Sequence, residues 1–283
     1  MELIKPRIVL PNLLSTSSGF FLASNKKSLN IKTYFFVLLG TFFIISCGCV
    51  LNNIIDRKYD MKMERTKDRI LAKNKISLIY VFIFSLFLFI LGTYILLFFI
   101  NTLSYLISFF GLFSYVFLYT FILKKNSEYS TIFGSFAGAC PIIIGYSSVK
   151  NSLDYFCLIL FFIFFFWQIP HSYSIYLLNL KDYKNANISV FPVLYNIRKT
   201  IKHMYFYLFG LILFTFIFTF LTYSNFLYSI FFLFLGFYWL FLIKQGDNLS
   251  NNKKKWFRKI FRFSIFYIIL LNFSVFINYL EIF

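Results

Sequence analysis

Long apolar runs separated by short polar segments dominate the chain. Crossing the hydrocarbon core of a bilayer takes about 20 apolar residues in one helix, and nine stretches approach or exceed that length. They cover residues 9–24, 34–55, 77–99, 103–123, 131–149, 155–178, 203–222, 225–243 and 260–280. The first stretch is the weakest, because Pro11, Asn12 and the Ser15–Ser18 cluster interrupt it. The pattern predicts an all-α, polytopic membrane bundle, with residues 1–283 forming one integral membrane domain.

Composition and charge agree with this interpretation. Of 283 residues, 60% are hydrophobic and 13% are charged, whereas a soluble domain carries about 25% charged residues. The net charge is +18, and 24 of the 28 Lys and Arg residues fall in the N-terminal segment and in alternate loops. Basic residues favour the cytoplasmic side, so we expect a plasma (inner) membrane protein with its N-terminus in the cytoplasm and its C-terminus on the opposite side. That charge suits a lipid bilayer surface and an anionic substrate, and no soluble module is evident that would present it to nucleic acid.

The second apolar run ends in a regular series of polar residues. Asn52, Asp56 and Asp60 follow one another at intervals of four, so on a helix they form a single stripe. Like charges at this spacing destabilise an isolated helix, and the stripe therefore requires a compensating cation. Asn52 also falls at membrane depth, where a polar group indicates function.

Two kinds of cation can compensate the stripe. The first is the set of neighbouring Lys and Arg side chains, since charge mixing is common on solvated helix extensions. The second is Mg²⁺, which binds one or two carboxylates together with substrate phosphate oxygens. Arg65, Lys67 and Arg69 follow the stripe and are suited to hold those phosphates. The residues alone leave both interpretations open.

The motif Asn52-x-x-x-Asp56-x-x-x-Asp60 resembles the first metal–diphosphate motif of the UbiA-type membrane prenyltransferases. More narrowly, it resembles the heme-farnesylating branch of that family. The resemblance extends from about residue 5 to 195 and fades over the last three spans. Its other carriers are Lys5-Pro6-Arg7, Gly19-Phe20-x-Leu22-Ala23-Ser24, Tyr119-x-x-x-Leu123-Lys124, Trp167-Gln168-Ile169-Pro170-His171 and Lys181-Asp182-Tyr183.

The resemblance implies nine helices around a central cavity, with two acidic motifs that hold Mg²⁺ and an isoprenoid diphosphate. It implies that Asn52, Asp56 and Asp60 are catalytic and bind the metal. It further implies farnesyl diphosphate and heme B as substrates, and association with a terminal oxidase or other heme-modifying enzymes. The residues that it assigns to the diphosphate are Arg65, Lys67, Arg69, Tyr119 and Lys124.

A second group of candidates lies in and after the sixth apolar run. By the resemblance, Asp182 is a further metal ligand, while His171 and Trp167 contact heme. If one helix continues from 171 to 182, His171 lies deep and Asp182 lies on the same face at the mouth, about three turns away. Two alternatives remain open. Asp182 can be a loop carboxylate that pairs with neighbouring lysines, and His171 can be a neutral histidine that hydrogen-bonds to a neighbouring helix.

Three functions are consistent with these patterns. The first is farnesyl transfer to the vinyl group of heme B with addition of water, which gives heme O and diphosphate. The second is prenyl transfer to a quinone or phenolic acceptor, for which we would expect a more acidic second motif. The third is a transporter or assembly factor, which should carry ionisable residues at the midplane of several helices. Here the ionisable residues gather at one face, which disfavours the third function, and the second motif offers only Asp182, which disfavours the second. Together with the resemblance, this favours the first function.

Overall fold

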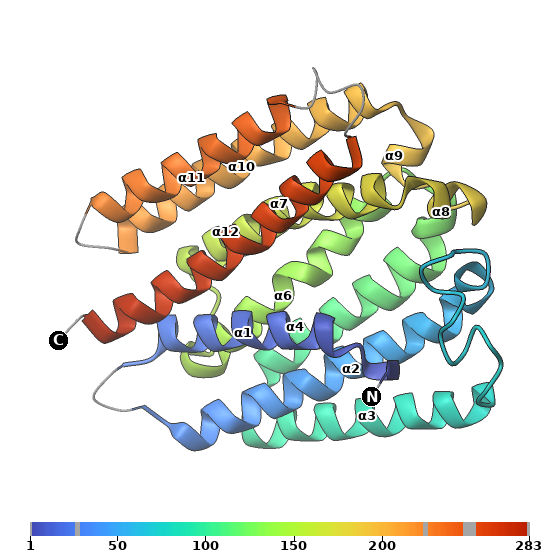
Figure 1. Cartoon of the computed structure of the whole chain (residues 1–283). Coiled ribbons are helices and arrows are strands. Elements are labelled where there is room, and N and C mark those ends of the chain that lie inside the picture. Colours follow the sequence, from blue (N-terminus) through green and yellow to red (C-terminus); the bar gives the residue numbers. More distant parts are fainter. Residues whose placement is uncertain (1, 26–28, 223–225, 246–252, 282–283) are drawn as a thin grey trace.

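The computed structural model describes residues 2–25, 29–222, 226–245 and 253–281, and each regular element in these ranges is a helix (Figure 1). In chain order the elements are η1 (Glu2–Ile4), α1 (Pro6–Ala23), α2 (Ile31–Asp60), α3 (Leu78–Phe99), α4 (Thr102–Phe113), η3 (Ser114–Leu123), α5 (Lys124–Asn126), α6 (Ser130–Lys150), α7 (Tyr155–Leu178), α8 (Leu180–Asn185), α9 (Phe191–Leu194), α10 (Ile197–Thr222), α11 (Leu227–Lys244) and α12 (Lys253–Glu281).

The predicted membrane spans are confirmed at eight positions. Within the described ranges, eight helical segments are long and apolar enough to cross a membrane. They are α2, α3, the continuous stretch from α4 to α5, α6, α7, α10, α11 and most of α12. Many of their large apolar side chains are exposed, for example Phe98 and Phe234. In a chain of this class such side chains face lipid, so each span can be apolar on every side.

The ninth predicted span, α1, is a helix of 18 residues that falls outside this set. Three of its polar side chains bond to the backbone of the helix itself. The hydroxyls of Ser15, Thr16 and Ser18 donate to backbone carbonyls four residues earlier at 3.2, 3.0 and 3.1 Å. Because a hydroxyl satisfied in this way costs little to bury, these three side chains lie buried in the bundle. The polar cluster that weakens the sequence signal is therefore compatible with a helix at this position.

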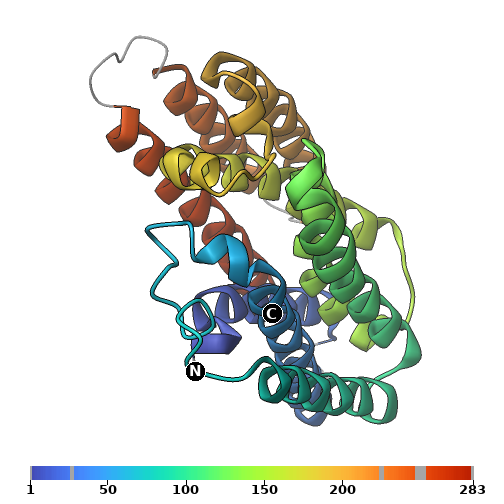
Figure 2. The same cartoon turned by 90° about the vertical axis from the view of Figure 1, so that its right-hand side faces the viewer.

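The helices follow one another around the bundle in chain order. Each packs against its predecessor, and α12 closes the arrangement because it packs against α1 as well as α7 and α11. In Figure 2, α1–α3 lie on one side of the bundle and α10 and α11 on the other, and α12 reaches from that side to α1. The loop after α2 and the short helix α8 lie at the end where the N-terminus is found, while the C-terminus lies at the opposite end (Figure 1). The segments that carry the candidate site residues thus meet at one end.

Two glycines let α1 and α6 approach at backbone distance. A Cβ atom on Gly145 would lie 1.9 Å from Thr16 O, and one on Gly19 would lie 1.9 Å from Ile142 O. Small residues allow such approach between membrane helices, where packing drives association. Because α1 continues directly from Lys5, this contact also fixes the height of the N-terminal segment in the bundle.

We predict that Gly145→Ala destabilises the protein, because its methyl group meets a backbone carbonyl that cannot rotate away. Overpacking of this kind costs about 1–3 kcal/mol or more. Thermal unfolding in detergent should show a clear drop in midpoint. Gly48→Ala is the control, since its Cβ would meet side chains and no backbone atom, with Leu112 Cδ1 at 3.1 Å and Tyr115 Cδ1 at 3.2 Å. Equal midpoints for the two variants would contradict the assignment of α1–α6 as a backbone contact.

Candidate active site

Three buried polar side chains form a stripe on the last two turns of α2. Asn52, Asp56 and Asp60 are 4%, 4% and 6% exposed. Asn52 Nδ2 donates to Asp56 Oδ2 at 2.9 Å, so the amide and the carboxylate are already in contact along the stripe. The four-residue spacing therefore does place these groups on one face, and that face points into the bundle. Burial of two carboxylates requires compensation, because an isolated buried charge is costly.

Three basic side chains from other segments supply that compensation. Lys124 Nζ lies 2.5 Å from Asp56 Oδ2, and Arg69 Nη1 lies 2.8 Å from Asp60 Oδ2. Lys5 Nζ donates to Asn52 Oδ1 at 2.5 Å. The structure thus brings together Asn52, Asp56 and Asp60 with two of the predicted diphosphate residues. These three cations outnumber the two carboxylates, so the cluster favours an added anion.

Lys5 reaches the stripe through a specific fold of the N-terminal segment. Asn53 Nδ2 donates to Leu3 O at 2.9 Å, which holds η1 against α2. The backbone of Lys5 is left-handed, with φ 49°, although this residue precedes Pro6, where an extended conformation is usual. Strain of this kind often occurs at functional sites. Burial, followed by the charge of Arg69, lowers the pKa of Lys5 to about 8.

A π-helical segment, η3, brings in the next side chains. Its wide turns place residues five apart on one face, and Thr120 Oγ1 accordingly donates to Tyr115 O at 2.7 Å. Thr120 also accepts from Asn52 Nδ2 at 3.2 Å. Tyr119 and Lys124 are likewise five apart, and Lys124 Nζ lies 5.8 Å from the centre of the Tyr119 ring. The segment thereby brings Lys124 to the stripe and places Tyr119 beside Lys124.

The remaining predicted diphosphate residues lie on the loop after α2. Arg65 and Lys67 are exposed there, and Lys67 pairs with Glu64. Asp182 Oδ2 accepts a hydrogen bond from the Arg65 backbone N–H at 3.3 Å. Asp182 therefore faces this loop from α8. The uninterrupted helix from 171 to 182 does not exist, because α7 ends at Leu178 and Asn179 leaves helical geometry.

His171 and Trp167 form a separate group on α7, against α12. Trp167 Nε1 donates to Ser264 O at 2.8 Å, and His171 Nδ1 lies 2.7 Å from Ser264 Oγ. The two rings stack with centroids 4.6 Å apart. Tyr176, on the same helix, contacts Tyr119 through their hydroxyls at 3.2 Å. The helix α7 therefore links the two groups of site residues.

The acidic stripe fits a hard divalent cation by its donor chemistry. Asp56 Oδ1 is buried and has no hydrogen-bond partner among the described residues. With Asn52 and Asp60 it offers amide and carboxylate oxygens, which Mg²⁺ prefers, and Mg²⁺ commonly completes its shell with phosphate oxygens. In the ranges that the structure covers, no three His, Cys, Asp or Glu side chains gather closely enough to hold an ion by themselves. Asp182 is thus not drawn to Asp56 and Asp60.

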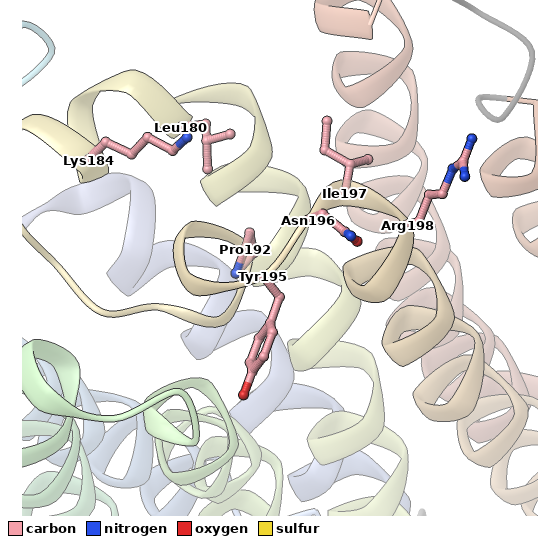
Figure 3. A pocket seen from close by; sticks show the side chains of 7 residues that line it. All are labelled: Leu180, Lys184, Pro192, Tyr195, Asn196, Ile197 and Arg198. Atoms are coloured by element: carbon pink, nitrogen blue, oxygen red, sulfur yellow. The ribbon is translucent and has the colours of Figure 1, made fainter.

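A surface hollow of about 470 Å³ lies near α8. Its two basic side chains, Lys184 and Arg198, lie on opposite sides of it (Figure 3). Tyr195 in its wall donates to Glu128, which ties the segment before α10 to the loop before α6. The hollow includes none of the predicted site residues, and its lining consists of Leu180, Lys184, Pro192, Tyr195, Asn196, Ile197 and Arg198.

Several residues at these groups were not predicted from the sequence as site residues. Lys5 and Tyr176 contact predicted residues, but neither has a spacing that singles it out. Lys5 belongs to the Lys5-Pro6-Arg7 motif. That motif could have identified Lys5 as a candidate site residue, because this lysine before a short apolar helix had no other role. Ser264 lies in α12, where the resemblance to known proteins had faded. No signal in the sequence could have found it.

A bundle of apolar helices that buries two carboxylates against lysine and arginine defines an integral membrane protein with a site for an anion. The UbiA prenyltransferase family model matches residues 12–266. The chain therefore belongs to the UbiA prenyltransferase family.

Individual proteins agree with that membership. A protein from Buchnera aphidicola subsp. Cinara cedri named protoheme IX farnesyltransferase is 45% identical over 280 residues, covering 98% of this chain and 99% of that protein. Two solved structures share the fold. A digeranylgeranylglyceryl phosphate synthase has a TM-score of 0.78 at 20% identity and covers 99% of this chain and 97% of its own. A UbiA homologue from Archaeoglobus fulgidus, bound to GPP and Mg²⁺, has a TM-score of 0.70 at 16% identity, with coverages of 97% and 98%.

We predict that Lys124→Met strongly destabilises the protein, because it leaves the buried Asp56 carboxylate without its cation. Removal of one partner from a buried pair costs about 3–5 kcal/mol. The double variant Lys124→Met/Asp56→Asn should recover part of that loss, since the charge is removed together with its partner. Denaturant or thermal unfolding in metal-free detergent measures both. A double variant no more stable than Lys124→Met would contradict the buried pair.

Proposed function

We propose that this chain transfers a farnesyl group from farnesyl diphosphate to a vinyl group of heme B, with addition of water, to give heme O and diphosphate. The observation that carries the proposal is the buried stripe of Asn52, Asp56 and Asp60 surrounded by Lys5, Arg69 and Lys124. Such a site suits a magnesium diphosphate. The protoheme IX farnesyltransferase relatives supply the acceptor, because they match the chain over nearly its whole length.

The donor half of the reaction follows from the charges of the site. The C1–O bond of farnesyl diphosphate breaks, and its electron pair leaves with the diphosphate. Arg69 and Lys124 lie where they can stabilise the developing negative charge, in a buried site where such contacts are strong. Arg65 and Lys67, exposed on the adjoining loop, are proposed to bind the outer phosphate oxygens, and Tyr119 to donate a hydrogen bond from η3.

Asn52, Asp56 and Asp60 are proposed to hold Mg²⁺, and Asp182 is proposed to contribute from the opposite side. When bound, the ion supplies a positive charge that stabilises the leaving diphosphate. When the magnesium diphosphate binds, Lys124 and Arg69 would leave the carboxylates and pair with the diphosphate. The carboxylate oxygens would then coordinate the metal.

The acceptor half is assigned to α7. The π electrons of the vinyl group form the new C–C bond to farnesyl C1, and water adds to the resulting cation and loses a proton. We propose that His171 and Trp167 contact the heme. With about 1.5 Å of rise per residue, His171 lies about 7.5 Å along the helix axis from Tyr176, which contacts Tyr119 beside the stripe. In this proposal, α7 connects the acceptor site at His171 with the donor site beside Tyr119.

We predict that Asp56→Asn and Asp60→Asn each lower turnover by at least about 100-fold, because both remove a charge that would bind the metal. The assay supplies membranes with heme B, farnesyl diphosphate and Mg²⁺, and follows pigments by chromatography and mass spectrometry. The expected product is heavier than heme B by one farnesyl and one hydroxyl group, and EDTA should abolish it.

Asp68→Asn is the matched control. The Asp68 carboxylate lies on the loop after α2 and pairs with Lys73, but it is exposed to solvent, so this variant should leave turnover unchanged. Near-normal activity in Asp56→Asn and Asp60→Asn would refute the metal assignment. A folded wild-type protein that forms no heme product would refute the acceptor, and phenolic and quinone precursors would be the next acceptors to test.

We also propose that the end carrying the stripe faces the cytoplasm of a bacterial inner membrane, with the C-terminus outside. The charge asymmetry supports this orientation, although Lys26 and Lys27, which count toward the other side, lie outside the described residues. Association with a terminal oxidase or another heme-modifying enzyme stays a prediction, since it would pass a poorly soluble product directly onward.

Labelling from outside the cell tests the orientation. The four native cysteines are buried, so a single added thiol dominates the signal. We predict that a membrane-impermeant maleimide labels Ser152→Cys in intact cells and labels Asn126→Cys only after the cells are opened. Both positions are exposed, and they lie at opposite ends of α6. The reverse pattern would invert the proposed topology.

A further inference from the structure

Ser264 makes three hydrogen bonds at the point where α12 meets α7. Its backbone carbonyl accepts from Trp167 Nε1 at 2.8 Å, and its Oγ lies 2.7 Å from His171 Nδ1. The same Oγ donates to Phe261 O, one turn back on α12, at 2.6 Å. The side chain of Ser264 is fully buried. These contacts determine which nitrogen of the histidine carries its proton.

A serine hydroxyl has one hydrogen to donate. Because Ser264 Oγ lies 2.6 Å from a carbonyl oxygen, its hydrogen must point there, since two oxygens at that distance repel one another without it. The oxygen can then only accept from the imidazole. His171 Nδ1 therefore carries the proton, and Nε2 carries the free lone pair.

The lone pair on Nε2 remains available for a ligand. Nε2 has no hydrogen-bond partner in the part of the chain that the structure describes, and it is not one of the fully buried polar atoms there. The ring is also fixed on its faces, by Trp167 at 4.6 Å and by Phe261 at 5.3 Å between centroids. An imidazole that donates through one nitrogen and is free at the other is the arrangement found for metal-ligating histidines in proteins.

We propose that Ser264 is a positioning residue that holds His171 as its Nδ1–H tautomer, so that Nε2 binds the iron of the heme acceptor. This inference rests on the proposed function, which supplies the heme. Ser264 itself does not touch the substrate. It acts through the imidazole. Its backbone carbonyl also accepts the hydrogen bond from Trp167, and a substitution of the Ser264 side chain leaves that carbonyl in place.

The tautomer can be measured without heme. The chain has two histidines, so ¹⁵N-histidine NMR of the detergent-solubilised protein, with His171→Gln to assign the signals, resolves the ring nitrogens of His171. We expect Nδ1 protonated and Nε2 unprotonated in the wild type, and an altered tautomer ratio in Ser264→Ala. A wild-type signal with the proton on Nε2 would overturn the proposal.

The second arm is a titration of the protein with ferric heme B, read by the Soret band and by electron paramagnetic resonance. Loss of a hydrogen bond to a ligating histidine lowers metal affinity by about 10–100-fold. We therefore expect Ser264→Ala to bind heme more weakly by that factor and to show an altered signature of histidine ligation, whereas His171→Ala should abolish that signature. Ser264→Thr keeps the hydroxyl and should restore the wild-type spectrum.

Ser85→Ala on α3 is the control. Ser85 is equally buried and makes the same local hydrogen bond, from its Oγ to Phe82 O at 2.7 Å, but it lies on another helix. It should leave the heme spectrum unchanged. Wild-type heme affinity and spectrum in a folded Ser264→Ala variant would overturn the role of Ser264. Failure of the wild type to farnesylate heme in the turnover assay would instead refute the proposed function, whatever the tautomer.

Discussion

Two carboxylates buried on α2 impose the requirement around which the site is built. Asp56 and Asp60 lie inside an apolar bundle. There an unpaired charge destabilises the fold by more free energy than a single contact between helices contributes. The partners of these acids come from two other segments: Lys124 follows the π-helical segment η3, and Arg69 lies on the loop after α2. The positions of η3 and of that loop are therefore tied to the acids. A change at Asp56 should therefore affect the position of Lys124 after η3, and a change at Asp60 should affect the loop that carries Arg69.

The same compensation explains why the site suits a magnesium diphosphate. In the structure the carboxylates are paired with ammonium and guanidinium groups, which can transfer to an anionic ligand as the metal takes their place. The total charge of the cluster hardly changes in this exchange. Lys5 adds a third cation, whose strained backbone is held by the contact between Asn53 and Leu3. The N-terminal segment thus belongs to the site as well as to the fold.

The membrane spans and the stripe on α2 could be predicted from the sequence, whereas the contacts between distant helices could not. Apolar runs report membrane spans because lipid leaves the chain few other options, and eight of nine are found as apolar spanning helices. The stripe on α2 follows from helix geometry alone. The π-helical turns of η3 and the break at Asn179 could not be predicted, because neither has a local sequence signature.

Contacts such as Lys5 to Asn52 and Ser264 to His171 depend on how distant helices pack. In a membrane protein, lipid-facing and core-facing positions are equally apolar, so periodicity does not reveal that packing.

The closing position of α12 has a consequence for the biosynthesis of the protein. The two acids and their three cations all precede residue 125 in the chain. The hydroxyl of Ser264, which is proposed to set the tautomer of His171, lies in the last helix, α12. During translation, a nascent chain that has inserted through α6 holds every residue assigned to the diphosphate, and every proposed metal ligand except Asp182. It lacks the histidine, and after α7 it still lacks the partner that fixes the imidazole. By these proposed roles, the residues for the prenyl donor are synthesised well before those for heme, and a chain stalled ahead of α12 carries the first set without Ser264.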